Sequence, residues 1–176
     1  MLYIAAILLA IAALFYYFRL SVPKQSFGEL LDSEMEGYPE GTSEALSHVT
    51  TILRNQIIAT CDDKPLPEKA FTNYSLGYIN GLLMGALDHA DIDDTETAIF
   101  GMKYCYQNIF GSEHDHGLVK HTSSLLKHAE DTFTDGVNDG LTEYERYTDG
   151  EIKAPVGWIH YIFDRPLPAD NEIARE

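Results

Sequence analysis

The chain has 176 residues, of which 45% are hydrophobic and 23% are charged, and its 28 acidic and 12 basic side chains give a formal charge of −16. This length fits a single domain with a substantial core, which argues against disorder throughout the chain. The acidic balance argues against nucleic acid as a partner, because phosphate binding needs a basic surface and the basic residues here come at best in loose pairs.

Residues 1–20 are predicted to be a membrane anchor. The run from Met1 to Phe18 contains no charged side chain, and a helix of that length spans roughly 27 Å, just enough to cross a bilayer. The run ends in aromatic residues and Arg19 follows at once, a pattern typical of the membrane–water interface. We therefore expect one transmembrane helix in contact with the lipid bilayer.

The basic residues that flank this segment predict its orientation. Arg19 and Lys24 follow the apolar run, and no basic side chain precedes it. Since basic flanks are retained in the cytoplasm, the rest of the chain is expected to face the cytoplasm. The alternative is an exported protein with a cleaved signal peptide, for which residues 10–12, Ala-Ile-Ala, offer a cleavage site. The retained anchor is favoured, since cleavage there would leave a mature chain that begins with hydrophobic residues.

Three further regions follow the anchor. Residues 21–41 are predicted to form a juxtamembrane linker with a short acidic helix around 27–36, which the glycines at 37 and 41 end. Residues 42–150 are expected to form a helical bundle domain, and residues 151–176 a C-terminal extension.

The first two helices of the bundle have clear boundary signals. Thr42 or Ser43 suits the N-cap of the first helix, whose apolar residues recur at helical spacing as far as Cys61. The second helix is expected to run from Pro67, a residue tolerated in the first helical turn, to about His89.

The remaining helices are predicted in the same way. Asp93 or Asp94 can cap a third helix, which stops at Gly111. After a polar loop over 112–116, apolar residues keep the helical phase from 118 to 144, which predicts one long helix ending near Gly150. Residues 151–176 are assigned to neither helix nor strand. With no sustained period-two pattern, the predicted class is all-α, a bundle of about four main helices after the anchor.

Glycines recur every fourth residue in two of these helices, as Gly77, Gly81 and Gly85 in one and Gly136 and Gly140 in the other. Each glycine inside a helix is less favourable than alanine by about 1 kcal/mol, so a packing advantage must offset the loss. We predict that the two rows face each other and let the helix backbones approach closely.

Two alternatives to close packing stay open for the glycine rows. One row could leave room for a ligand against bare backbone. Alternatively, the uncharged stretch 70–87, with its small-xxx-small pattern, could be a second membrane helix, although several of its residues are polar.

The long helix also carries a row of acids four residues apart, Asp131, Asp135, Asp139 and Glu143. The simpler interpretation is a solvated face. The alternative is a docking surface for a basic partner or a divalent cation.

Histidines gather near the start of the same segment. His114, Asp115, His116 and His121 lie close together in the sequence and are candidate ligands for a divalent metal, and His89 could join them from another helix. The pair His114-Asp115 resembles the paired ligands of HD-type phosphohydrolases, but residues 111–113 replace the apolar helix that normally leads into that pair. The activity of that family is therefore not carried over.

These observations lead to two functional hypotheses. The first is a membrane-anchored acidic helical domain that binds or scaffolds another protein, with neither a cofactor nor catalytic activity. The alternative is a membrane-tethered, metal-dependent hydrolase that uses the histidine and aspartate cluster around 114–121.

Overall fold

The computed structural model describes residues 37–61 and 65–168, and within these ranges it contains helices and no strand. The predicted all-α class is confirmed for this part of the chain. The expected anchor over 1–20 and the acidic helix around 27–36 lie outside the described residues. None of the described helices is long and apolar enough to cross a membrane, and this includes the stretch 70–87.

The first described helix, α3 (Thr42–Cys61), ends at Cys61 as predicted, but Thr42 is its first residue and not its N-cap. It buries Leu46, Val49 and Leu53, which lie on one face at helical spacing. The hydroxyl of Thr42 donates a hydrogen bond to the carbonyl oxygen of Pro39 at 2.7 Å, which ties the helix start to the preceding turn.

The helix predicted from Pro67 begins later than expected. A short 3-10 helix, η1 (Glu68–Phe71), precedes α4 (Asn73–His89), and Thr72 separates them in an extended conformation with φ −75° and ψ 159°. The Thr72 hydroxyl donates to the carbonyl oxygen of Lys69 and accepts from the backbone N–H of Ser75. Because Thr72 acts as an N-cap, the main helix starts after it.

The third predicted helix is α5 (Thr95–Phe110). The carboxylate of Asp94 accepts a hydrogen bond from the backbone N–H of Thr97 at 2.7 Å, so Asp94 is the cap. Gly111 follows the helix with φ 91°, a conformation that favours glycine. Both predicted ends are confirmed.

The single long helix predicted over 118–144 is wrong, because the chain forms two helices there, α6 (Asp115–His128) and α7 (Asp131–Thr148). Ala129 ends α6 in a left-handed conformation with φ 46°. Glu130 then caps α7, since its carboxylate accepts a hydrogen bond from the backbone N–H of Phe133 at 2.7 Å. The predicted loop over 112–116 is also shorter, because α6 already begins at Asp115.

The C-terminal stretch left unassigned contains a short helix, α8 (Gly157–Ile162). Trp158, Ile159 and Ile162 on this helix are buried, and so is Ile152 in the preceding loop. These residues belong to the same core as the bundle helices.

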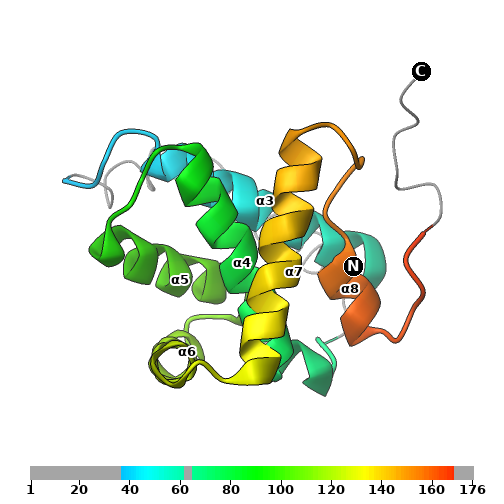
Figure 1. Cartoon of the computed structure of the whole chain (residues 1–176). Coiled ribbons are helices and arrows are strands. Elements are labelled where there is room, and N and C mark those ends of the chain that lie inside the picture. Colours follow the sequence, from blue (N-terminus) through cyan, green and yellow to red (C-terminus); the bar gives the residue numbers. More distant parts are fainter. Residues whose placement is uncertain (1–36, 62–64, 169–176) are drawn as a thin grey trace, which may run out of the picture. The chain divides into compact units, whose positions relative to one another are not determined.

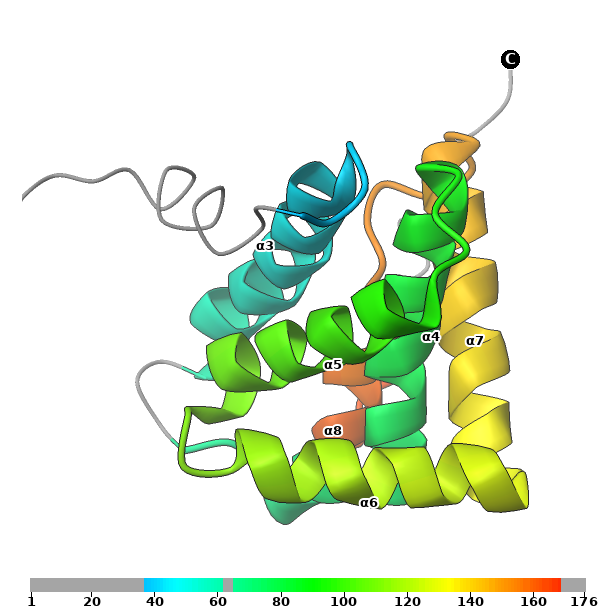
Figure 2. The same ribbon diagram turned by 90° about the vertical axis from the view of Figure 1, so that its left-hand side faces the viewer.

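The central helix of the bundle is α4, which contacts every other described element. Figure 1 shows α7 lying along α4, with α8 next to α7. Figure 2 shows α6 crossing one end of the α4–α7 pair, while α3 and α5 pack on α4 elsewhere. The arrangement brings the start of α4, the second half of α7 and α8 together around one pocket.

Candidate functional site

The two glycine rows meet where α4 packs against α7. A Cβ atom added at Gly77 would lie 2.1 Å from the carbonyl oxygen of Phe133, and one added at Gly140 would lie 2.2 Å from that of Tyr78. Backbone atoms of the opposite helix likewise stand against Gly81 and Gly136, and the Tyr144 ring stands against Gly85. The opposite helix fills the space beside these glycines, so the rows leave no room for a ligand.

This close packing sets the register of polar side chains at the edge of the contact. Tyr74 and Tyr78 of α4 face Asp139 and Glu143 of α7. The two tyrosines are one helical turn apart, and so are the two acids. The Tyr74 hydroxyl donates to Oδ2 of Asp139 at 2.7 Å. The Tyr78 hydroxyl donates to Oε2 of Glu143. Two side-chain hydrogen bonds therefore link helices that are about sixty residues apart in sequence.

Glu143 also holds the start of α8. Its Oε1 accepts a hydrogen bond from the backbone N–H of Val156 at 2.9 Å, and its Oε2 accepts one from that of Gly157 at 3.0 Å. The predicted solvated face of α7 therefore changes along its length. Asp131 and Asp135 are exposed, whereas Glu143 is half-buried and fully engaged as an acceptor.

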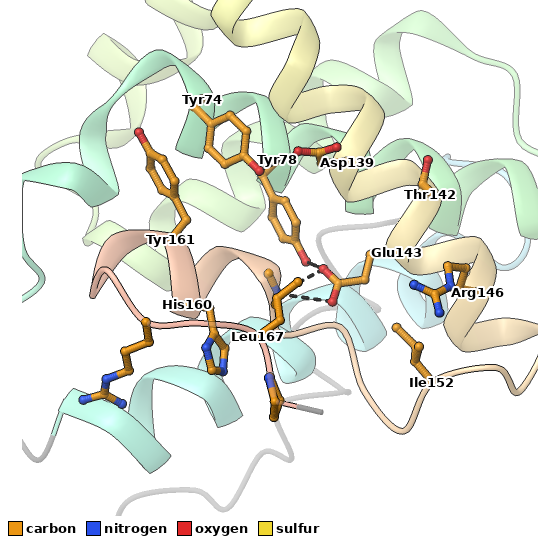
Figure 3. Close-up of a pocket in the computed structure, with 13 residues that line it drawn as sticks. Tyr74, Tyr78, Asp139, Thr142, Glu143, Arg146, Ile152, His160, Tyr161 and Leu167 are labelled. Atoms are coloured by element: carbon orange, nitrogen blue, oxygen red, sulfur yellow. Dashed lines mark hydrogen bonds between the residues drawn. The ribbon is translucent and has the colours of Figure 1, made fainter. Parts of the chain in front are cut away.

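A pocket of about 450 Å³ opens between α4, α7, α8 and the segment that follows α8 (Figure 3). Tyr74 and Tyr161 form one wall, with ring centroids 4.3 Å apart. Tyr78 and Glu143 meet across the pocket through their hydrogen bond. Asp139 lines the pocket from the side of α7.

The phenols of Tyr74 and Tyr78 are held in their protonated form. Burial raises the pKa of Tyr78 well above its usual value, and the charge of Glu143 and the hydrogen bond to it raise it further. The pKa of Tyr74 is raised by burial first and then by Asp139. Both hydroxyls therefore act as hydrogen-bond donors at neutral pH, and neither is suited to act as a base.

The two arginines that line the pocket have partners of their own, whereas one ring nitrogen of the pocket histidine has none. Nε of Arg146 lies 3.3 Å from a carboxylate oxygen of Glu151. The guanidinium carbon of Arg165 lies 5.0 Å from the ring centroid of Phe163. The Nδ1 atom of His160 is buried and has no hydrogen-bond partner among the described residues.

The predicted metal ligands around α6 have separate neighbours. The ring of His114 packs edge-on against Phe71, and Nε2 of His121 lies 3.1 Å from Oδ1 of Asn73. His116 lines a different pocket, of about 400 Å³, beside Tyr38. Asp115 is the first residue of α6, and His89 is the last residue of α4. Among the side chains that the structure describes, no three histidine, cysteine or acidic groups lie close enough to hold a metal ion.

The pocket residues Tyr74, Tyr78, His160 and Tyr161 were not predicted as a site. One sequence signal was available. The two tyrosines on α4 and the acids on α7 recur every fourth residue, which is also the spacing of the glycines beside them. Aromatic faces and carboxylates both attract cations, so this arrangement is suited to recognition of a positively charged group. In comparison with known proteins, no family model, no curated protein and no solved structure matches the chain.

Proposed function

We propose that this protein is a single-pass membrane protein whose acidic helical domain faces the cytoplasm and binds another protein without catalysing a reaction. The observation that carries the binding part of this proposal is the pocket between α4, α7 and α8. Its half-buried carboxylate, Glu143, accepts hydrogen bonds from a phenol and from backbone N–H groups, and the phenols of Tyr74 and Tyr78 stay protonated. Such a pocket presents a fixed pattern of charge and aromatic surface, which favours binding over proton transfer.

The membrane part of the proposal depends on residues 1–20. The uncharged run up to Phe18, the aromatic residues at its end and the basic residues Arg19 and Lys24 support a retained anchor with the domain on the cytoplasmic side. A domain held there is confined to proteins that reach the membrane surface, which suits a scaffolding role.

Membrane insertion and orientation can be tested on the full chain. Alkaline extraction should leave the wild-type chain in the membrane pellet, with the mass of the uncleaved sequence. A variant with Leu9→Asp and Ala10→Asp should move to the soluble fraction, because each central aspartate makes insertion less favourable by about 3 kcal/mol. A reporter that is active only in the cytoplasm should be active when it is fused to the C-terminus. A soluble wild-type chain that lacks its first residues would contradict the proposal.

The binding part of the proposal requires that a partner protein be identified. The tagged full chain would be cross-linked in its own membranes, solubilised in mild detergent and purified, and the retained proteins identified by mass spectrometry. We expect one or a few proteins to be retained in fixed proportion to the bait. A bait that retains none above the level of an unrelated single-pass protein would remove the support for a binding module.

A further inference from the structure

We infer that the pocket between α4, α7 and α8 binds a lysine or arginine side chain presented by the partner protein. This inference rests on the proposed binding function and adds the chemistry of recognition to it. It follows from three features of the pocket: uncompensated carboxylates, an aromatic wall, and basic neighbours that are already engaged.

The first feature is negative charge without a cationic partner. Asp139 and Glu143 both line the pocket. The hydrogen bonds they accept come from the phenols of Tyr74 and Tyr78 and from backbone N–H groups, which are all neutral donors. Neither carboxylate takes part in the ion pairs Lys69–Asp164 and Arg146–Glu151.

The geometry leaves part of this charge accessible. Asp139 is exposed, and its Oδ2 accepts from Tyr74 while Oδ1 accepts no hydrogen bond from a described residue. A guanidinium or ammonium group could therefore bind Oδ1 without displacing a bond that holds α4 to α7. Charge-assisted hydrogen bonds of this kind are stronger than those between neutral groups.

The second feature is the aromatic wall. The rings of Tyr74 and Tyr161 lie at an angle of 38° with centroids 4.3 Å apart. The chain already places one cation against this wall, since Nζ of Lys69 lies 5.4 Å from the ring centroid of Tyr161. A second cation entering from the pocket would meet the same aromatic surface, where cation–π attraction adds to that of the carboxylates.

The third feature is that the two arginines of the pocket already have other contacts. Arg146 pairs with Glu151, and Arg165 lies over the ring of Phe163. An anionic ligand would instead have to approach Asp139 and Glu143. The volume of about 450 Å³ is in the range of pockets that hold small ligands, and so has room for one long side chain.

The test uses the purified full chain in non-ionic detergent and an acetylated, amidated tetra-arginine peptide as the probe, with tetra-glutamate as the counterpart of opposite charge. The chain has one tryptophan, Trp158, which follows the pocket residue Gly157 on α8, so its fluorescence reports on the pocket. Calorimetry gives the affinity independently. We expect saturable binding of tetra-arginine at one site and none of tetra-glutamate.

Three variants at two positions of the same acidic row make the test specific. Asp139→Asn should weaken tetra-arginine binding by at least about tenfold, because it removes the pocket charge while leaving an oxygen that can accept from Tyr74. Asp135→Asn removes the same charge one turn earlier, outside the pocket, and should weaken binding by less than about threefold. Asp139→Glu, which keeps the charge, should stay close to the wild type.

Several results would overturn the inference. Equal losses in Asp139→Asn and Asp135→Asn would mean attraction to the overall negative charge, and the absence of saturable binding would mean no cation site. Tighter binding of tetra-glutamate would assign the pocket to anions. Retention of the same membrane partner by the wild-type and Asp139→Asn chains in equal yield would overturn the inference while leaving the proposed function standing.

Discussion

The helices α6 and α7 follow each other in the chain but use their glycines differently. In α7, Gly140 lies against α4, and a Cβ atom there would be 2.2 Å from the carbonyl oxygen of Tyr78. In α6, nothing lies within 4 Å of the place where a Cβ of Gly117 would be. The same residue type therefore permits close helix packing in one helix and only weakens the other. A glycine inside a helix becomes informative when it recurs in a row that a second row can match.

The largest expected effect comes from a substitution that obstructs the close contact between α7 and α4. Gly140→Ala should destabilise the domain by about 3 kcal/mol, because the added methyl group meets backbone atoms and relief requires the helices to separate. The measurement is urea unfolding of the full chain in mild detergent, followed by circular dichroism.

Gly117→Ala is the matched control for this substitution. It should stabilise the domain by about 0.5 kcal/mol, because alanine favours the helix and no neighbour is displaced. If both variants unfolded at the same urea concentration, the close approach of α4 and α7 would not be needed for stability.

A smaller effect is expected at the polar edge of α7. Glu143→Gln should destabilise the domain by about 2 kcal/mol, since an amide has one acceptor oxygen for the donors that the carboxylate now satisfies at Tyr78, Val156 and Gly157. Amide exchange at Val156 and Gly157 should accelerate as α8 loosens.

The exposed Glu145, two residues further along α7, provides the control. Glu145→Gln should change stability by less than about 0.5 kcal/mol, as expected of a surface position. Unchanged exchange at Val156 in the Glu143→Gln chain would show that this carboxylate does not hold α8.

The sequence predicts helices best where a local residue determines their ends. The bounds of α5 follow from the Asp94 cap and from Gly111, and both act within one turn of the helix. The break between α6 and α7 has a weaker signal, because alanine rarely takes the left-handed conformation of Ala129 and glutamate, the type of the capping residue Glu130, is not a usual N-cap. Apolar residues keep helical spacing on both sides of this break, so the pattern alone predicts one helix.

The candidate site is less predictable for a related reason. The hydrogen bonds from Tyr74 to Asp139 and from Tyr78 to Glu143 each join residues 65 positions apart. The sequence shows a period of four in each helix, but the register between the helices depends on packing. Conversely, His114 and His121 are near each other in sequence but have different neighbours, Phe71 for His114 and Asn73 for His121.

A modest gain in stability is expected at the junction of α6 and α7. Ala129→Gly should stabilise the domain by about 0.5–1 kcal/mol, because glycine adopts the left-handed conformation at φ 46° without the strain that alanine incurs. Gly150→Ala is the opposite control: Gly150 has φ 69° with no atom within 4 Å of an added Cβ, so only the backbone is affected. The two variants should shift the urea midpoint in opposite directions, and a shift in the same direction would contradict this account of the junction.

The smallest expected effect is a dependence on pH at the contact between α3 and α7. Nδ1 of His48 lies 3.0 Å from the Tyr144 hydroxyl, and the His48 ring also packs near Tyr147. Burial and the neighbouring His89 lower the pKa of His48 below its usual 6.5. In the unfolded chain His48 therefore takes up a proton at a higher pH than in the folded chain, so stability should fall as the pH drops below 6.5 towards the folded pKa.

The measurement compares urea midpoints of the wild type and His48→Gln between about pH 7.5 and 5.5, a range that brackets the ordinary histidine pKa. The carboxyls of Asp94 and Glu130, whose pKa values their capping hydrogen bonds lower, stay ionised throughout this range and contribute no change. The loss of stability on acidification should be smaller in the variant, because the share due to His48 is absent. Parallel pH profiles for the two chains would assign the acid sensitivity to other groups and leave the contact of His48 with α7 as a packing contact alone.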